Sequence, residues 1–503
     1  MAESRIPGEI RQYRPGPCTE IKPISGHYYV YMYEACRLPN GTWGRKIGKS
    51  IGKIITGVGF IPNKNYHLFK KDGTELLDED AITVLEYGQY ALVRALAGDI
   101  LSGLQKYFPA DRAAQIFSYA SILFVNDFAH LDQISTYYEQ SWLSLEFGKL
   151  TLKMGKTALG SMLDDLGRRT TRVVSYEKSL VASSSAKMAI DGHAIGSCSG
   201  ENDLAETGCK FRTLKEDQVN LLMGYDIATG MPLFARMFRG TCSDKSTIGD
   251  LDSLLKFKGI LFVVDRGFYS DDNLAILSSN GNAYIIPVPA NTNLFKDAMR
   301  DVKYTGSFYY RSGSKHSRIE YQEKHLHDSN GAETTVFVFR DVDENEKSRF
   351  NYLRCLELGK SGYTQDGFEA SKDFFGVYVL RTNGVQGHEW TFCNYKKRWG
   401  IETFYQYVAN VGDFNDLMVQ DYYKEQGMAF VLLVAGQIHH KVIEAVKGLS
   451  CSTISTRDIL LMARRMKIER RGNFWLLKNT RKKDLEIFTK MNFKPAESIA
   501  VVD

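Results

Sequence analysis

The sequence predicts a mixed α/β protein, in which a mixed sheet with flanking helices carries a β-rich insertion and follows β-rich and helical N-terminal regions. Three observations predict this class. The apolar run Ile260–Val264 ends at Asp265 and Gly267, as a buried central strand does. Strand-like runs precede it within residues 186–238, and a long stretch with helical apolar spacing comes before those runs.

Length and composition limit the class of protein. A chain of 503 residues is expected to form three or four units, and its 44% hydrophobic residues exclude a disordered chain. The eight cysteines include no CxxC pair, which argues against a zinc or redox motif. Without a recognisable signal peptide, they indicate reduced thiols in a cytoplasmic protein. The longest apolar run, Ala429–Ala435, is far shorter than the roughly 20 residues that cross a bilayer.

Residues 1–80 are expected to form a β-rich module. His27–Tyr33 has the aromatic content of a strand, and Asn40–Gly41 is a hairpin signal. Gly44–Ser50 is similar to a phosphate-binding loop but is one residue too short, and no buried strand precedes it. The sequence therefore predicts no nucleotide cofactor.

Residues 81–184 are expected to be helical. Apolar residues recur there mostly at helical spacings, first up to Pro109 and again from Asp111 to Phe124. The first set consists of Val84, Leu85, Leu92, Leu96, Ile100 and Leu104. Stripes of this kind are typical of a helical core and are equally compatible with packing between two subunits.

Residues 185–289 and 374–412 are expected to carry the sheet. Its predicted elements, in order, are the strands Ala186–Ile195, Asn220–Ile227 and Pro232–Phe238, the helix Thr247–Lys256, the Asp265 strand and the strand Tyr284–Val288. Residues 290–373 form the β-rich insertion, with strand signals at Phe308–Tyr310, Thr334–Phe339 and Phe350–Leu353. Phe374–Leu380 then leads back to the sheet.

Residues 413–503 are expected to be helical and basic. Phe430–Val446 has the composition of a helix that packs on the core. From Cys451 onward, lysine and arginine outnumber aspartate and glutamate by twelve to six, although the whole chain has a net charge of only +5. Such a tail suits a phosphate backbone and is equally compatible with a solvated helical face.

Three acids are candidates for one site. Asp265 ends its strand, where open α/β sheets bind ligands, and Asp191 is a charge within an apolar strand, which is costly unless it is paired or holds a metal. Tyr395, Arg398 and Glu402 form one stripe of a predicted helix. Two of the three acids, Asp265 and Glu402, have an ordinary alternative. Asp265 could cap the next helix, although Ser270 is the better cap, and Arg398 with Glu402 could be a surface ion pair.

Taken together, these residues resemble a known family. The order Asp191, Asp265, Glu402, with Glu402 inside Tyr-x-x-Arg-x-x-x-Glu, is similar to the DDE transposases of bacterial insertion sequences, in the superfamily with a Y-R-E-K signature. The matching segments are Ile190–His193, Val264–Phe268 and Tyr395–Glu402. The chain departs from the signature at Ala409, where the family has a lysine that contacts DNA near the cleaved end.

The resemblance implies a ribonuclease-H-like catalytic core with the insertion lying over the DNA. It implies an enzyme that binds the terminal inverted repeats of its own mobile element and catalyses metal-dependent cleavage and strand transfer, which is cut-and-paste transposition. Asp191, Asp265 and Glu402 would then be the catalytic residues and the ligands of two Mg²⁺ ions per site, with Mn²⁺ as a substitute.

The resemblance also implies the partners. Tyr395 and Arg398 are expected to hold phosphates beside the scissile bond, and either Tyr395 or Trp399 is expected to stack on an unpaired base. Arg266 and His193 adjoin the acids and are expected to contact DNA or to orient the ligands, with a structural role as the alternative. The partners are double-stranded DNA, both element ends and target, and a second copy of the chain that holds the other end. Residues 1–80 would bind the DNA end, and residues 81–184 would bind DNA or dimerise. The expected location is the bacterial cytoplasm, on the nucleoid when DNA is bound, with no membrane contact.

Two other functions fit parts of the sequence. A phosphatase or phosphotransferase with Asp265 as nucleophile usually has a second acid two residues later, and that position is Gly267. A catalytically silent DNA-binding protein derived from a transposase is favoured by Ala409. It is disfavoured by the presence of all three acids, because a protein without catalysis has little reason to keep them.

Overall fold

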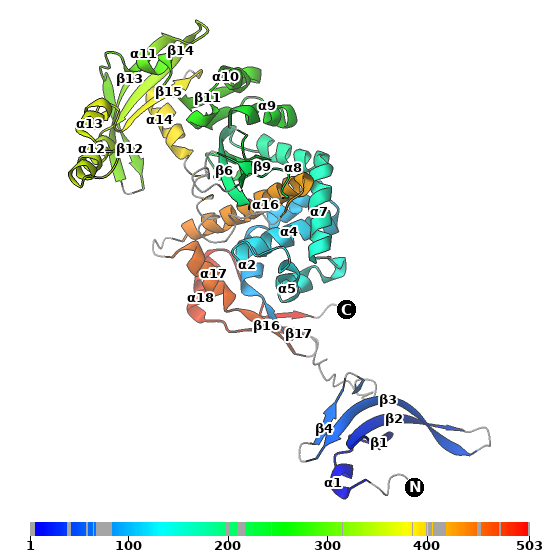
Figure 1. The fold of residues 1–503 in the computed structure, drawn as a ribbon. Coiled ribbons are helices and arrows are strands. Elements are labelled where there is room, and N and C mark those ends of the chain that lie inside the picture. Colours follow the sequence, from blue (N-terminus) through cyan, green and yellow to red (C-terminus); the bar gives the residue numbers. More distant parts are fainter. Residues whose placement is uncertain are drawn as a thin grey trace. The chain divides into compact units, whose positions relative to one another are not determined.

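The computed structural model describes residues 6–37, 42–56, 59–63, 65–66, 83–197, 201–208, 217–242, 244–313, 315–384, 386–398, 400, 405, 419–449, 454–471 and 474–500 (Figure 1). The chain divides into two compact units. The strand unit comprises Met1–Leu85, Lys467–Lys478 and Ala496–Asp503. The core unit comprises Glu86–Met466 and Asn479–Pro495.

The N-terminal part of the strand unit is a four-stranded antiparallel sheet. It consists of β1 (Thr19–Ile24), β2 (His27–Arg37), β3 (Trp43–Ile55) and β4 (Gly59–Pro62), in that order, with α1 (Gly8–Arg11) before them. The predicted strand His27–Tyr33 is confirmed, and β2 pairs with β3 as a hairpin signal requires. Asn40–Gly41 themselves lie outside the described residues. Gly44–Ser50 lies within β3, so it is extended rather than a phosphate-binding loop.

A second sheet of four strands contains β5 (Val84–Glu86), β16 (Lys467–Arg471), β17 (Phe474–Lys478) and β18 (Ser498–Ala500). It corrects two predictions. Val84 and Leu85 are in a strand rather than a helix, and the C-terminal region is not purely helical. Strands this short show no clear alternation of apolar and polar residues, and the strands that pair lie at opposite ends of the sequence. The sequence pattern therefore could not reveal these strands.

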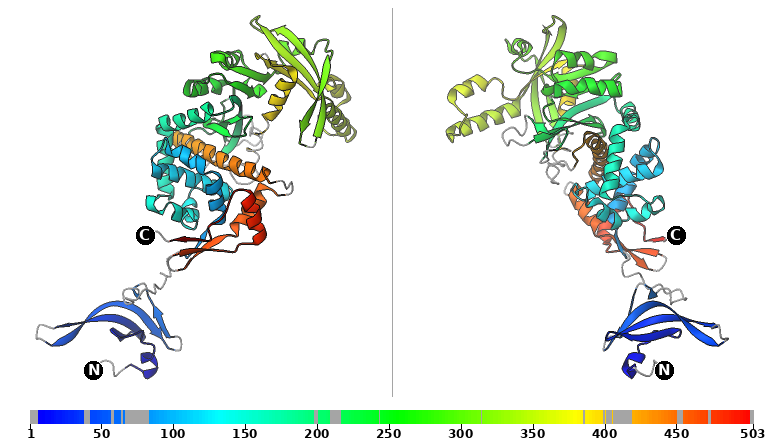
Figure 2. Two further views of the ribbon diagram at one scale, coloured as in Figure 1. Left: turned by 180° about the vertical axis from the view of Figure 1, so that it is seen from behind. Right: turned by 45° about the vertical axis from the view of Figure 1, so that its right-hand side comes forward.

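The core unit begins with helices, as predicted. They are α2 (Gly88–Leu96), α3 (Gly98–Gln105), α4 (Ala110–Val125), α5 (Ile134–Glu139), α6 (Leu143–Glu146), α7 (Lys156–Arg168) and α8 (Thr170–Ala182). The long helix α16 (Tyr422–Lys447) contains the predicted apolar helix Phe430–Val446 and packs against α4, α7 and β9 (Figure 1 and Figure 2). It is long and apolar enough to cross a membrane, but most of it is buried inside this unit, as in a core helix.

The centre of the core unit is a mixed sheet. Its predicted strands are observed as β6 (Lys187–Ser197), β8 (Asp217–Asp226), β9 (Pro232–Arg239), β10 (Leu261–Val264) and β11 (Ala283–Pro287), with a short β7 (Glu206–Thr207). Strand β8 pairs antiparallel with both β6 and β9, and β10 pairs parallel with both β6 and β11. The helices α8, α9 (Asp244–Leu255) and α10 (Asp271–Leu277) supply apolar residues to a core cluster with these strands.

The insertion extends the same sheet. Strands β12 (Gly306–Ser312), β13 (Lys315–His327) and β14 (Glu333–Asp341) continue it, and β15 (Val377–Thr382) lies between β14 and β11. The complete ten-stranded sheet has the order β12-β13-β14-β15-β11-β10-β6-β8-β7, with β9 on β8. The insertion therefore shares a continuous hydrogen-bonded framework with the strands that carry Asp191 and Asp265.

Helices flank the insertion and complete the unit. They are α11 (Asn293–Met299), α12 (Val342–Glu357), α13 (Gln365–Ser371), α14 (His388–Lys397), α17 (Thr456–Arg464) and α18 (Lys482–Lys490). The predicted strand Phe350–Leu353 is wrong, because these residues lie within α12. Asp341 caps that helix by accepting a hydrogen bond from the backbone of Glu344, and acids in the first turn favour it. A run of four residues is too short to outweigh these signals.

Candidate active site

Strands β6 and β10 bring Asp191 and Asp265 to neighbouring positions. Val264, the last residue of β10, pairs with Ile190 on β6 in the parallel ladder; Asp191 is the next residue on β6, and Asp265 directly follows β10. Asp265 is extended and is followed by the single turn Arg266–Phe268. Ser270, not Asp265, caps α10 by accepting a hydrogen bond from the backbone N–H of Asn273. The capping alternative for Asp265 is therefore excluded.

Arg398 bridges the two acids from the end of α14. One guanidinium nitrogen lies 3.4 Å from Oδ2 of Asp191, and another lies 3.9 Å from Oδ1 of Asp265. The Arg398 side chain is only 7% exposed, whereas those of Asp191 and Asp265 are 18% and 41% exposed. A buried cation between two carboxylates offsets their mutual repulsion, which allows the acids to lie side by side.

Tyr405 and His193 complete the described part of the site. The Tyr405 hydroxyl donates a hydrogen bond to the backbone carbonyl of Asp191 at 3.0 Å. Its ring stacks on His193, with 4.8 Å between ring centroids and 12° between the planes. The chain beyond α14 thus returns to β6 beside Asp191. Sequence reasoning missed Tyr405 as a site residue, because an aromatic in an aromatic-rich segment gives no local signal.

The structure separates the predicted DNA-contact residues into three groups. Arg266 is exposed beside Asp265, and His193 is partly exposed beneath Tyr405. Tyr395 is only 6% exposed and packs in the core against Tyr378, and its contact with DNA stays a prediction. Trp399, Glu402 and Ala409 lie outside the described residues.

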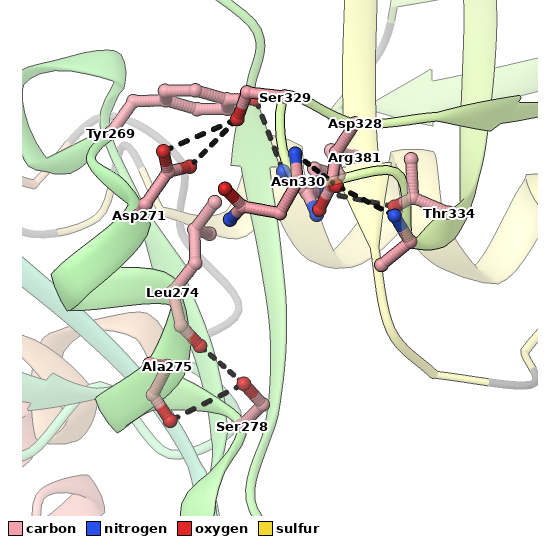
Figure 3. A network of polar contacts seen from close by, with 11 residues as sticks. Tyr269, Asp271, Leu274, Ala275, Ser278, Asp328, Ser329, Asn330, Thr334 and Arg381 are labelled. Carbon is pink, nitrogen blue, oxygen red and sulfur yellow. Dashed lines mark hydrogen bonds and ion pairs between the residues drawn. The ribbon is translucent and has the colours of Figure 1, made fainter.

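A buried polar network braces the segment after Asp265 (Figure 3). Arg381 on β15 forms an ion pair with Asp328 at 2.5 Å, and donates to the hydroxyls of Thr334 and Tyr269 at 2.9 and 3.3 Å. Burial would raise the pKa of Asp328, but hydrogen bonds from Arg381 and two backbone N–H groups hold it below its ordinary value. The network therefore ties the β13–β14 turn to Tyr269, four residues beyond Asp265.

Like Tyr405, this polar network could not be predicted from the sequence, because Tyr269, Asp328 and Arg381 are far apart in the chain. Only the return of β15 between β14 and β11 brings them together.

The donor set of the site fits a hard divalent cation. Carboxylate oxygens are the ligands that Mg²⁺ and Mn²⁺ prefer, and Asp191 and Asp265 supply them from rigid strands. Among the described residues, no group of three or more His, Cys, Asp or Glu side chains could hold a metal ion. The predicted third ligand, Glu402, is not among those residues.

Comparisons with known proteins place this domain in a family. A model of the transposase DDE domain matches residues 184–435. No curated protein matches the chain. Among solved structures, the cryo-EM structure of the piggyBac transposase synaptic complex with hairpin DNA is similar, with 12% identity over 76% of this chain and 80% of that one. Its TM-score of 0.38 is too low to support an argument from shape. Because the family model covers half of the chain and includes both Asp191 and Asp265, the protein belongs to the transposase DDE domain family.

Proposed function

We propose that this transposase cleaves DNA at the terminal inverted repeats of its own mobile element and joins the ends to target DNA. The observation that carries the proposal is that Asp191 on β6 and Asp265, directly after the parallel neighbour β10, lie close together and are bridged by Arg398 within the family domain. Two adjacent carboxylates on a rigid sheet are the arrangement that metal-dependent phosphoryl transfer needs.

The strand order supports a ribonuclease-H-like core. Strands β6, β8 and β9 are antiparallel neighbours, α9 follows them, and β10 then returns parallel to β6. This is the order of three strands, a helix and a fourth strand that the family resemblance implies. In this proposal, Asp191 on the first strand and Asp265 after the fourth strand are the counterparts of the family's two aspartates.

Glu402 is the proposed third carboxylate. Arg398, four residues before Glu402, and Tyr405, three residues after it, both contact Asp191. The chain between them is short, which supports a place for Glu402 at the same site. With Asp191 as the shared ligand and Asp265 and Glu402 each completing one position, the site would hold two Mg²⁺ or Mn²⁺ ions.

When bound, such ions activate the attacking oxygen and stabilise the leaving oxygen of an in-line displacement at phosphorus. The protein's own residues provide the orientation. Tyr405 fixes the backbone of Asp191, and Arg398 holds the two aspartates together. The exposed Arg266 is suited to a phosphate beside the scissile bond, since a guanidinium forms bidentate contacts with phosphate oxygens.

The test is cleavage of a labelled duplex that carries the inverted repeats flanking the coding region. The wild type should cut at the repeat boundary with Mg²⁺ or Mn²⁺ and not with EDTA, and Asp265→Asn should remove detectable cleavage while DNA binding persists. Asp272→Asn is the matched control, because this acid on α10 is exposed and close in sequence. Binding without cleavage by the folded wild type would instead support the silent DNA-binding alternative.

A further inference from the structure

The sheet β1–β4 has one covered face and one exposed face. Val30 and the neighbouring side chains Tyr28 and Met32 lie against a small core that includes Ile10 and Ile51. Side chains alternate along a strand, so Tyr29, Tyr31 and Tyr33 lie on the opposite face, and none of the three joins that core. These three tyrosines are partly exposed and occupy alternate positions along β2. We call this row and its flanking cations the tyrosine face.

Cations flank the row on both neighbouring strands. Tyr29 pairs with Lys22 on β1 and with Lys53 on β3. The Lys22 ammonium lies 5.4 Å from the centre of the Tyr31 ring, and the Arg45 guanidinium lies 4.6 Å from that of Tyr33. The four strands together carry six lysines or arginines and two glutamates. Glu20, the β1 partner of Tyr31, is an acid on this face, and Lys22, Arg45 and Lys53 outnumber it, so the tyrosine face is complementary to a polyanion.

The row continues toward the end of the hairpin. Arg37 lies 5.9 Å from the ring of Trp43, and Trp43 is 72% exposed. Trp43 lies on β3 as the strand partner of Arg37, and it is not part of the small core of this sheet. Both features fit a ligand that combines aromatic rings with negative charge.

The spacing of the tyrosines selects the form of nucleic acid. Alternate residues on a strand are roughly 6.7 Å apart, about twice the 3.4 Å that separates stacked bases along one strand of a duplex. Bases that stack on successive tyrosines must therefore be splayed apart, and their faces must be accessible. Only unpaired bases meet both conditions. Sequence-tolerant binding of single strands uses aromatic stacking platforms within a positively charged groove.

We propose that the tyrosine face binds single-stranded DNA, with bases stacked on Tyr29, Tyr31 and Tyr33 and phosphates held by the flanking cations. Exposed cation–π contacts are weak, so incoming bases displace Lys22 and Arg45 from the rings, and these cations then pair with phosphates. The choice of DNA over RNA rests on the proposed function, whereas the recognition of an unpaired strand rests on the geometry of the sheet.

The test measures binding of the full-length protein to a fluorescent oligothymidine in EDTA, which excludes cleavage and makes the outcome independent of Asp265. The single strand should bind more tightly than a duplex of equal length. The triple variant Tyr29→Leu, Tyr31→Leu, Tyr33→Leu should raise Kd by at least about fivefold, the lower end of the loss for one stacked base. The corresponding triple phenylalanine variant keeps the rings and should bind as the wild type does.

Controls separate stacking from charge and from misfolding. Tyr309→Leu changes a tyrosine on β12 that is 72% exposed but belongs to the other unit, and should leave Kd unchanged. Lys53→Gln should lower the salt dependence of binding, whereas the leucine variant should be weaker at every salt concentration. Equal binding by the leucine and phenylalanine variants, both folded by circular dichroism, overturns the proposal. Preference for the duplex, or for an RNA of the same sequence, overturns it as well.

Discussion

At the scale of single residues, Arg398 explains how two acids share one edge of the sheet. Its guanidinium is charged at any pH at which the protein folds, and it lies within 3.4 Å of one carboxylate and 3.9 Å of the other. Its burial fixes this position. The sequence analysis predicted that Arg398 contacts DNA. In the structure it contacts Asp191 and Asp265, so we infer that it positions these two aspartates.

Arg398→Lys tests this role. A lysine carries a single point of charge and cannot span both carboxylates, so cleavage should fall by about 10- to 100-fold, the range for residues that orient metal ligands. The half-maximal Mg²⁺ concentration should change at the same time, which a purely structural defect would not cause. Arg300→Lys changes an exposed arginine and serves as the control. Wild-type cleavage and metal dependence in Arg398→Lys would exclude a positioning role.

Glu425 gives a pH-dependent prediction at the same scale. It is buried on α16, and burial, together with the negative charges of Asp203 and Asp421, raises its pKa to about 8. The unfolded chain loses this proton near pH 4.5, whereas the folded protein keeps it. The free energy of unfolding should therefore decrease as the pH rises from 4.5 to 8, by at most about 1.4 kcal/mol per pH unit from this group.

Glu425→Gln removes the titrating group and keeps its shape. Urea unfolding at several pH values should show the variant increasingly more stable than the wild type toward pH 8. Glu444→Gln, on an exposed position of the same helix, should follow the wild-type profile. If the free energy of unfolding depends on pH in the same way for Glu425→Gln and the wild type, Glu425 is ionised in the folded protein.

At the scale of elements, two glycines allow α7 and α16 to pack closely. A Cβ at Gly427 would lie 2.1 Å from the backbone oxygen of Leu163, and one at Gly167 would lie 1.9 Å from that of Tyr423. Backbone atoms cannot move aside as a flexible side chain can. The close approach of these helices therefore requires glycine at both positions, although glycine weakens a helix by itself.

Gly427→Ala should consequently destabilise the protein by about 1–3 kcal/mol, which is the usual effect of overpacking. This destabilisation is expected although alanine has a higher helix propensity than glycine. Gly160→Ala is the matched control on α7, because nothing lies within 4 Å of its added Cβ. This control should stabilise the protein by up to about 1 kcal/mol. Urea unfolding measures both. Stabilisation by Gly427→Ala would show that the helices are not in backbone contact.

At the scale of the whole molecule, long-range pairing organises both units. The strand unit collects segments from the two ends of the chain, and β5 pairs in one sheet with strands that follow it by hundreds of residues. In the core unit, the insertion is continuous with the sheet that carries the aspartates. Its turn is tied by Arg381 and Asp328 to the segment after Asp265. Substitutions in the insertion are therefore expected to affect the site, because the hydrogen-bonded sheet and the Arg381–Asp328 ion pair connect the two.

The sequence by itself determined the elements with strong local signals. Ile260–Val264, Ala186–Ile195 and the apolar helix within α16 were predicted because a long apolar run has few alternatives to burial. The order Asp191, Asp265, Glu402, with Glu402 inside Tyr-x-x-Arg-x-x-x-Glu, indicated the family, and the family model matches this part of the chain. The assignment of Glu402 as the third ligand stays a prediction.

Only the tertiary structure decided which side chains meet. The bridge from Arg398 to both aspartates, the stacking of Tyr405 on His193 and the burial of Tyr395 depend on where α14 and the chain after it lie on the sheet. Phe350–Leu353 and β16–β18 were misread because short segments take their conformation from caps and distant partners. Local patterns fix the face that a residue prefers to bury, whereas the contacts of a site come from long-range pairing that no local pattern contains.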